Sequence, residues 1–164
     1  MQADQLLTTL EKLYKLHRSL YDLSLEKTNI IKKGETEALN DVMIKEQNYL
    51  TAINTLEIKR QQLAAEFLTS KGIRFWEAPS LMDVIERADE PEKARLNQIR
   101  QKLLKVTEEL KEQNELNQKL VYQSLQFVNM NLSMFQPQPP KGNYSRPNQK
   151  KEQSEQTSMF DSKA

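Results

Sequence analysis

Apolar residues recur at steps of three and four along the first part of the chain. The main stripe consists of Leu6, Leu10, Leu13, Leu16, Leu20, Leu23 and Ile30. Four further residues widen it: Leu7, Tyr14, Tyr21 and Leu25. This spacing places the side chains along one side of an α-helix. We therefore expect a helix from about Ala3 to Lys33 that touches two neighbours.

A second amphipathic stretch follows almost at once. Lys32-Lys33-Gly34 is typical of a helix C-terminus, and Thr36 is expected to be the N-cap of the next helix. Its apolar stripe consists of Leu39, Val42, Met43, Tyr49, Leu50, Ile53, Leu56, Leu63 and Phe67. Gly72 followed by Ile73 predicts a Schellman-type ending. Because the connection between the two helices is about two residues long, they should form an antiparallel hairpin.

Residues 73–90 interrupt the helical pattern and then restart it. Ser80 and Asp83 form an Asp variant of the capping box, which predicts a short helix over 81–88. We expect this helix to plug one end of the bundle, with Phe75 and Trp76 as the apolar bulk of the plug.

A third long helix should open at Pro91, which suits the first helical position. Its line of core-facing residues, here called the seam, begins with Leu96, Ile99, Leu103, Val106 and Leu110. Polar Gln113 and Asn117 interrupt the seam, and apolar residues return at Leu120 and Phe127. Prolines from Pro137 onward stop the helix. At 1.5 Å per residue this helix is roughly 65 Å long, so part of it should be a surface for something else.

The positions of the helix breakers fix the overall division. No Gly or Pro falls within 1–33, 35–71 or 92–136. We expect an all-α fold: an antiparallel helical bundle or coiled coil of three long helices and one short helix over 1–136. Residues 137–164 have the composition of a disordered polar tail. Within that tail, Met159 and Phe160 are candidates for a short docking element that returns to 120–135 or engages another protein; an inert terminus is the alternative.

Composition and charge exclude several classes of protein. The net charge is +1 with scattered Lys and Arg, so a nucleic-acid partner is not expected. There is no cysteine, which excludes disulfides and thiolate chemistry and fits a reducing cytoplasm. The sequence shows no signal peptide and no apolar run of membrane-spanning length. We therefore expect a cytoplasmic protein.

Chemistry-bearing residues are sparse. His17 is the only histidine, whereas a di-iron bundle would need two Glu-x-x-His pairs. There is no Gly-rich phosphate loop and no nucleophile with a plausible base. We expect no enzyme activity, cofactor or metal site, and we interpret His17 as a structural, partly buried residue.

Two features of the third helix point to binding instead. The polar break Asn114-Glu115-Leu116-Asn117 fixes register, either by bonding to Glu46 or Arg60 or as a notch for a partner's backbone. On the seam pattern alone, Asn117→Leu should raise the melting temperature. Over 120–135, ten of sixteen residues are apolar or aromatic. This surface is either buried by helix one and the end of helix two, or docks a partner helix, and the two readings are compatible.

Several short motifs, taken in order, resemble one protein family. They are Glu26-Lys27-Thr28, Lys45-Glu46-Gln47, Asn114-Glu115-Leu116-Asn117, Ser124-Leu125-Gln126-Phe127 and the ending Phe160-Asp161-Ser162-Lys163-Ala164. With the hairpin, the interlude and the long third helix, they are similar to the FlgN-type flagellar export chaperones of bacteria.

The resemblance implies a non-enzymatic chaperone that holds hook-associated junction proteins of the FlgK and FlgL type and hands them to the export gate. It maps cargo contact onto about 114–135. The candidate cargo-binding residues are Asn114, Asn117, Leu120, Val121, Tyr122, Leu125, Phe127, Val128, Leu132 and Phe135. The alternative is a self-associating coiled-coil adaptor without cargo hand-off, and a homodimer is compatible with either function.

Overall fold

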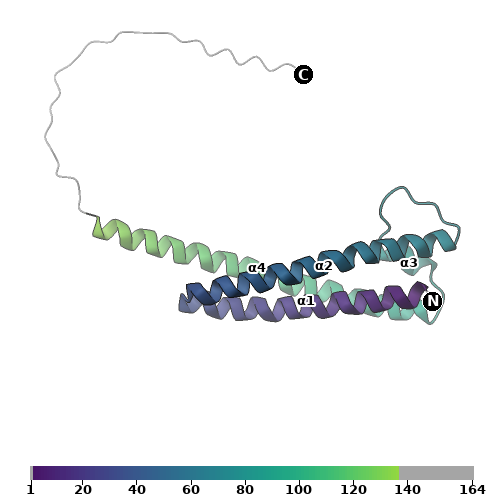
Figure 1. The fold of residues 1–164 in the computed structure, drawn as a ribbon, viewed down its shortest axis with the longest axis horizontal. Coiled ribbons are helices and arrows are strands. Elements are labelled where there is room, and N and C mark those ends of the chain that lie inside the picture. The colour runs from purple at the N-terminus through teal and green to yellow at the C-terminus, as the bar shows by residue number, and fades with distance from the viewer. Residues whose placement is uncertain (1, 137–164) are drawn as a thin grey trace, which may run out of the picture.

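A computed structural model describes residues 2–136 as four helices joined by short connections (Figure 1). They are α1 (Gln2–Lys33), α2 (Thr36–Ser70), α3 (Leu81–Arg87) and α4 (Glu92–Phe135). The expected all-α bundle of three long helices and one short helix is confirmed. The candidate docking residues Met159 and Phe160 lie outside the described residues.

The hairpin between α1 and α2 closes as the sequence predicts, with one correction. Gly34 adopts a φ of 70°, a conformation that favours glycine. The N–H of Glu35 donates to the Ile30 carbonyl at 3.3 Å, and the N–H of Gly34 donates to Ile31 at 3.1 Å, which together make a Schellman cap. The expectation of Thr36 as N-cap is wrong. Glu35 is the last non-helical residue and accepts from Leu39 through its carbonyl, so Thr36 already lies inside α2.

The far end of α2 carries the predicted glycine cap. Gly72 has a φ of 74°, and the N–H of Ile73 donates to the Leu68 carbonyl at 3.0 Å. Ile73 packs against the core beside this turn. The cap therefore ends α2 and anchors the connection to α3.

The predicted starts of α3 and α4 are correct to within one residue. The Asp83 N–H donates to the Ser80 hydroxyl oxygen at 3.2 Å, while the Ser80 N–H donates to the Asp83 carboxylate at 2.8 Å. This reciprocal pair is the expected capping box. Pro91 is the N-cap of α4 rather than its first helical residue, because its carbonyl already accepts from the Arg95 N–H.

The larger core cluster lies at the α3 end of the bundle. α1 contributes Leu6 and Leu10, α4 contributes Leu96, and α3 contributes Val84 and Ile85, all of them at most 1% exposed. The short helix α3 thus plugs this end, as the sequence predicts. The expectation that Phe75 and Trp76 fill it is wrong: Trp76 is 100% exposed. The connection that carries it projects away from the helices (Figure 1), and the apolar side of α3 fills the space instead.

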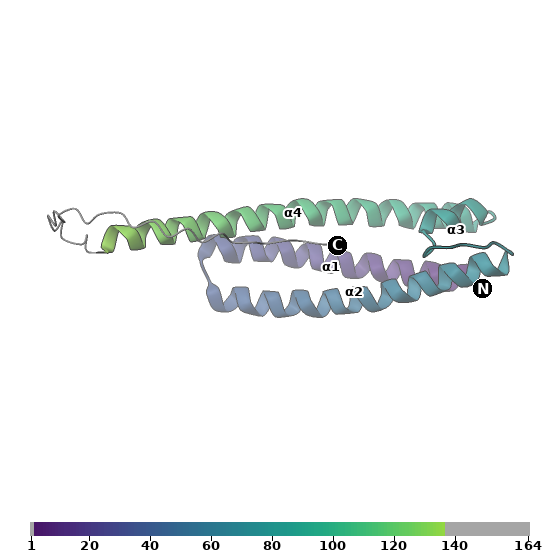
Figure 2. The same ribbon diagram turned by 90° about the horizontal axis from the view of Figure 1, so that it is seen from above.

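α1 is the central helix of the three long ones. It packs against both α2 and α4, with α2 antiparallel and α4 parallel to it (Figures 1 and 2). Among the described residues, no Cα atom of α2 lies within 8 Å of a Cα atom of α4. Because α2 and α4 do not close on each other, Met43 and Leu50 of the predicted α2 stripe are about half exposed. Leu25, expected to widen the α1 stripe, is exposed as well.

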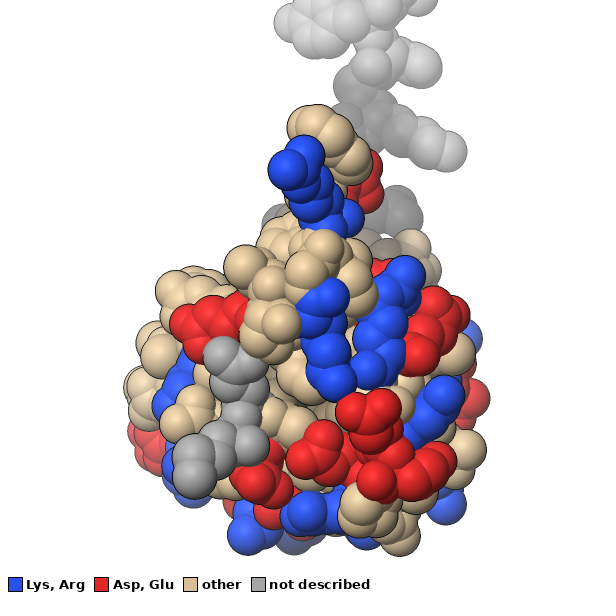
Figure 3. All heavy atoms as spheres, turned by 90° about the vertical axis from the view of Figure 1, so that its right-hand side faces the viewer, with Lys and Arg blue, Asp and Glu red and all other residues tan. Residues whose placement is uncertain are grey.

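The surface at the α3 end carries charges of both signs. Seen end-on, acidic and basic side chains are interspersed around the bundle, with other residues between them (Figure 3). This pattern agrees with the scattered charges of the sequence and the net charge of +1.

Candidate functional site

The C-terminal part of α4 extends past the rest of the bundle. Hydrogen bonds between α1 and α4 join residues 85 to 93 positions apart. Adding that offset to Lys33, the last residue of α1, places the end of α1 level with residues 118–126 of α4. Residues 124–135, here called the α4 overhang, therefore lie mostly beyond both partner helices (Figures 1 and 2). At 1.5 Å per residue, the overhang is about 18 Å long.

Apolar side chains of the overhang are exposed. Exposed fractions run from 50% for Val128 to 85% for Phe135, and Phe127 and Leu132 fall between them. The reading in which helix one and the end of helix two bury 120–135 is therefore wrong for the overhang. Among the apolar residues of that stretch, only Leu120 and Val121 are partly buried. The physical reason is length, because α1 and α2 end before the overhang begins.

The exposed surface also lacks charge. No charged residue occurs between Lys119 and Lys141. A solvated helix face normally carries charged side chains opposite its apolar stripe. A helical surface that is exposed, apolar and uncharged is typical of an interaction site.

Next to the overhang, a groove lies between α2 and α4 with α1 as its floor. It encloses about 500 Å³. Leu20 and Lys27 come from α1, and Glu46 and Leu50 come from α2. The α4 wall consists of Asn114, Asn117, Gln118, Val121, Tyr122 and Leu125. We call this space the outer groove.

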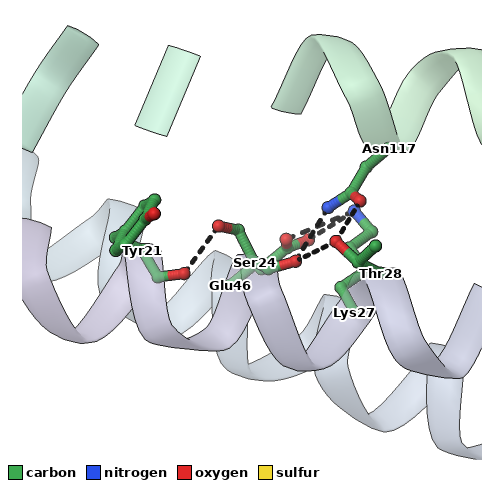
Figure 4. Close-up of polar contacts among 6 residues, drawn as sticks. All are labelled: Tyr21, Ser24, Lys27, Thr28, Glu46 and Asn117. Carbon is green, nitrogen blue, oxygen red and sulfur yellow. Dashed lines mark hydrogen bonds and ion pairs between the residues drawn. The ribbon is translucent and has the colours of Figure 1, made fainter. Parts of the chain in front are cut away.

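A polar cluster pins α4 to α1 under the outer groove (Figure 4). The Asn117 side-chain N–H donates to the Ser24 carbonyl at 2.9 Å, and the Thr28 hydroxyl lies 2.6 Å from Asn117 Oδ1. The Gln113 amide donates to the same hydroxyl at 2.6 Å. Asn117 is only 3% exposed, so its amide is satisfied inside the bundle.

This cluster corrects two expectations. The break residue Asn117 bonds to Ser24 and Thr28 of α1, and Glu46 and Arg60 are not its partners. The sequence could not reveal this pairing because the register between α1 and α4 depends on how the helices pack. Since a satisfied buried amide stabilises the fold, the expectation that Asn117→Leu raises the melting temperature no longer holds.

An ion pair forms part of the groove wall. Lys27 Nζ lies 2.9 Å from Glu46 Oε2, and both side chains are about four-fifths buried. The pair links α1 to α2 as the Asn117 cluster links α1 to α4 (Figure 4). Both fall within motifs that the sequence singled out, at Glu26-Lys27-Thr28 and Lys45-Glu46-Gln47.

The structure divides the predicted site residues between these two surfaces. Asn114, Val121, Tyr122 and Leu125 line the outer groove together with the buried Asn117. Phe127, Val128, Leu132 and Phe135 lie on the overhang, Leu125 belongs to both surfaces, and Leu120 is partly buried. Sequence reasoning missed Leu20 on the floor of the groove, Leu50 on the opposite wall and Gln118 on the α4 wall. The α1 and α2 stripes contained Leu20 and Leu50, but nothing local marked them as facing an open space.

His17 occupies the structural position expected of it. Its Nδ1 lies 2.8 Å from the Leu13 carbonyl within α1, and the side chain is partly buried. In the described part of the chain, His, Asp and Glu side chains nowhere gather in a group that could hold a metal ion. None of the described helices is apolar over a length sufficient to cross a membrane.

Comparisons with known proteins agree with this geometry. Residues 1–152 match the model of the FlgN protein family. The chain is also 33% identical over 165 aligned positions to the uncharacterized protein YvyG of Bacillus subtilis (strain 168), with complete coverage of both chains. No solved structure matches the chain. The family match spans all four helices and both surfaces described above, and the chain therefore belongs to the FlgN family of flagellar export chaperones.

Proposed function

We propose that this protein is a cytoplasmic chaperone for flagellar hook-associated proteins of the FlgK and FlgL type, with residues 1–136 as the chaperone unit. It binds a terminal helix of the cargo, prevents premature association and delivers the cargo to the flagellar secretion apparatus. The observation that carries the proposal is the α4 overhang, a helical surface that is exposed, apolar and uncharged.

The energetics favour an amphipathic helix as the ligand. Fully burying a Leu, Val or Phe side chain is worth about 1.5–3 kcal/mol. Phe127, Val128 and Leu132 could each contribute part of that amount when a partner helix covers the overhang. A helix laid against another helix satisfies its own backbone hydrogen bonds, so it brings few unpaired polar groups to an apolar surface.

The same surface suits reversible binding. Ordering the cargo segment consumes part of the free energy gained by burial. The remaining affinity can be moderate, as release at the secretion apparatus requires. Met130 and Met134, both exposed, have flexible side chains that adapt to more than one cargo surface.

The direct test is calorimetric titration of purified hook-associated protein with variants of the overhang and of the outer groove. Phe127→Ala with Val128→Ala, and separately Tyr122→Ala with Leu125→Ala, should weaken binding by about 1–4 kcal/mol for each hot-spot side chain removed. Ile44→Ala with Ile58→Ala is the matched control. These two α2 residues are 54% and 51% exposed but line neither the overhang nor the outer groove.

Two results would refute the proposal. In the first, both double variants remain helical by circular dichroism and bind cargo as the parent chain does. In the second, light scattering finds a tight dimer in which the overhang is protected and cargo does not compete. That outcome would favour the alternative, a self-associating coiled-coil adaptor.

A further inference from the structure

The space between α2 and α4 continues beyond the outer groove toward α3. A second hollow there, here called the inner groove, is lined by Leu10, Leu13 and His17 of α1, by Glu57 and Arg60 of α2, and by Leu103 and Leu104 of α4. The linings of the two grooves are adjacent. His17 and Leu20 are one turn apart on α1, and Leu50 and Glu57 are two turns apart on α2.

α3 shows what kind of element fits between α2 and α4. It packs against both helices, which do not approach each other within the described residues. Its Val84 and Ile85 belong to the same buried cluster as Leu10 and Leu13, the α1 residues that line the inner groove. Leu81, the first residue of α3, already lines the inner groove. A short amphipathic helix thus fills the fourth-helix position at one end of the bundle, and the same position is open along the rest.

Arg60 gives the inner groove a chemical preference. Its Nε and Nη2 donate to the Glu57 carboxylate at 2.9 and 2.6 Å. Its remaining nitrogen, Nη1, is buried and has no hydrogen-bond partner among the described residues. The side chain as a whole is 14% exposed. A buried guanidinium nitrogen without an acceptor is costly, so a ligand that brings an acceptor gains affinity.

The charge balance indicates which acceptor. Besides Arg60, the inner groove is lined by Arg100, whereas Glu57 is the acidic residue of the lining and is already engaged. Inside a bound helix, backbone carbonyls are used by the helix itself. The acceptor that complements this groove is therefore a side-chain carboxylate.

We propose that the cargo helix continues from the overhang through both grooves to α3, and that it presents an Asp or Glu side chain to Arg60. This inference rests on the proposed function and adds a specificity determinant to it. Along α4, the path from Arg100 to Leu125 corresponds to about 37 Å, or a helix of about 25 residues. The bound cargo helix would complete a four-helix bundle with α1, α2 and α4, in line with α3.

The first test measures binding of a purified full-length hook-associated protein to the full chain. Arg60→Gln should weaken binding about tenfold or more, because a hydrogen bond to a charged group is lost. Glu57→Gln should tighten binding, since it releases the guanidinium from its competing carboxylate. If both substitutions weaken binding equally, the ion pair has only a structural role and the proposal is wrong.

The second test does not depend on removing Arg60. Because the chain has no cysteine, a single one can be placed at will. Leu104→Cys reports on the inner groove, and Lys102→Cys is its control on the opposite flank of α4, where that residue faces Tyr14 and Arg95. Saturating cargo should slow maleimide labelling of the Leu104→Cys variant at least tenfold and leave labelling of the Lys102→Cys variant unchanged.

The outcomes separate this inference from the proposed function. In one outcome, replacing Phe127 and Val128 weakens cargo binding, but Arg60→Gln does not, and cargo does not protect the Leu104→Cys variant from labelling. That result would refute the path through the grooves and would agree with the proposed function. A hook-associated protein that does not bind the parent chain would refute both.

Discussion

The two ends of α4 place their apolar side chains in opposite surroundings. At the α3 end, Leu96 of α4 is fully buried together with Ile85 of α3. At the other end, Leu132 and Phe135 of the same helix lie in solvent. Both segments are helical, but residues 92–103 carry charged side chains whereas the overhang carries none. Their neighbours differ as well, because α3 covers the first segment and nothing in the described part of the chain covers the second.

This contrast shows how one helix can serve two purposes. The buried end supplies stability through the core that α1, α2, α3 and α4 share. The exposed end keeps apolar surface available at the cost of leaving it hydrated. Since the two segments are separated by the polar cluster around Asn117, a partner can engage the overhang without disturbing the core.

The largest expected effect is the difference in stability between a substitution at the α3 end and one on the overhang. Ile85→Ala should destabilise the fold by about 2–5 kcal/mol, because it empties a filled position in the core. Leu132→Ala, on the overhang, should change stability by less than about 0.5 kcal/mol. Urea denaturation of the two variants measures both. A loss at Leu132 comparable to that at Ile85 would mean that the overhang is covered in solution.

The polar cluster at the boundary should be the next most sensitive point. Asn117→Leu should destabilise the fold by about 1–3 kcal/mol, since Thr28 and Ser24 lose their partner. Thr28→Val combined with Asn117→Leu should recover part of that loss, because both partners are then apolar. Thermal melts of the single and double variants give the coupling. A higher melting temperature for Asn117→Leu alone would contradict this expectation and agree with the prediction from the seam pattern that Leu at this position stabilises the fold.

The capping box of α3 should make the stability of the α3 end of the bundle sensitive to acid. Hydrogen bonds from the Ser80 hydroxyl and the Ser80 N–H to the Asp83 carboxylate hold the pKa of Asp83 below its ordinary value. A lowered folded-state pKa adds stability above the unfolded-state value near 4, and that stability is lost as the pH falls through the folded-state pKa. Asp83→Asn should therefore destabilise the protein at about pH 6 and by less at about pH 3.

Glu86→Gln is the control for that experiment. Glu86 lies on the same short helix and pairs with Arg87, outside the capping box. Its substitution should not reproduce the pH dependence. Equal pH profiles for the two variants would show that the cap carboxylate is not the responsible group.

The smallest expected effect concerns the exposed tryptophan near the α3 end of the bundle. Trp76→Ala should leave stability within about 0.5 kcal/mol of the parent chain, because the side chain is fully exposed. As the chain contains a single tryptophan, its fluorescence should also be that of a hydrated indole before and after unfolding. A blue-shifted emission in the folded protein would mean that Trp76 packs against the α3 end of the bundle after all.

Local features of the fold could be predicted from the sequence. The glycines at 34 and 72 end helices because they adopt a positive φ, and the capping box at Ser80 and Asp83 starts one because its partners are three residues apart. These signals act within one helical turn and need no information about distant residues. The errors at Thr36 and Pro91 are shifts of one residue within the same turns.

Sequence reasoning also identified a surface without placing it. The excess of apolar residues over 120–135 indicated that one helix stripe could not bury them all. Whether α1 and α2 cover them depends on the offset between α1 and α4, which hydrogen bonds such as Thr28 to Asn117 reveal. Leu50 looked like a core residue but is 47% exposed, because the gap between α2 and α4 cannot be read from the local sequence.

The sequence by itself determined the helices, their ends and the amphipathic faces, because these follow from turns, caps and periodicity along the chain. Only the tertiary structure decided that Trp76 stays out of the plug, that Asn117 pairs with α1, and that α4 extends beyond its neighbours. Those outcomes depend on the relative offset and spacing of helices, set by side chains about ninety residues apart. Packing across such distances leaves no periodic signal in the residues that take part.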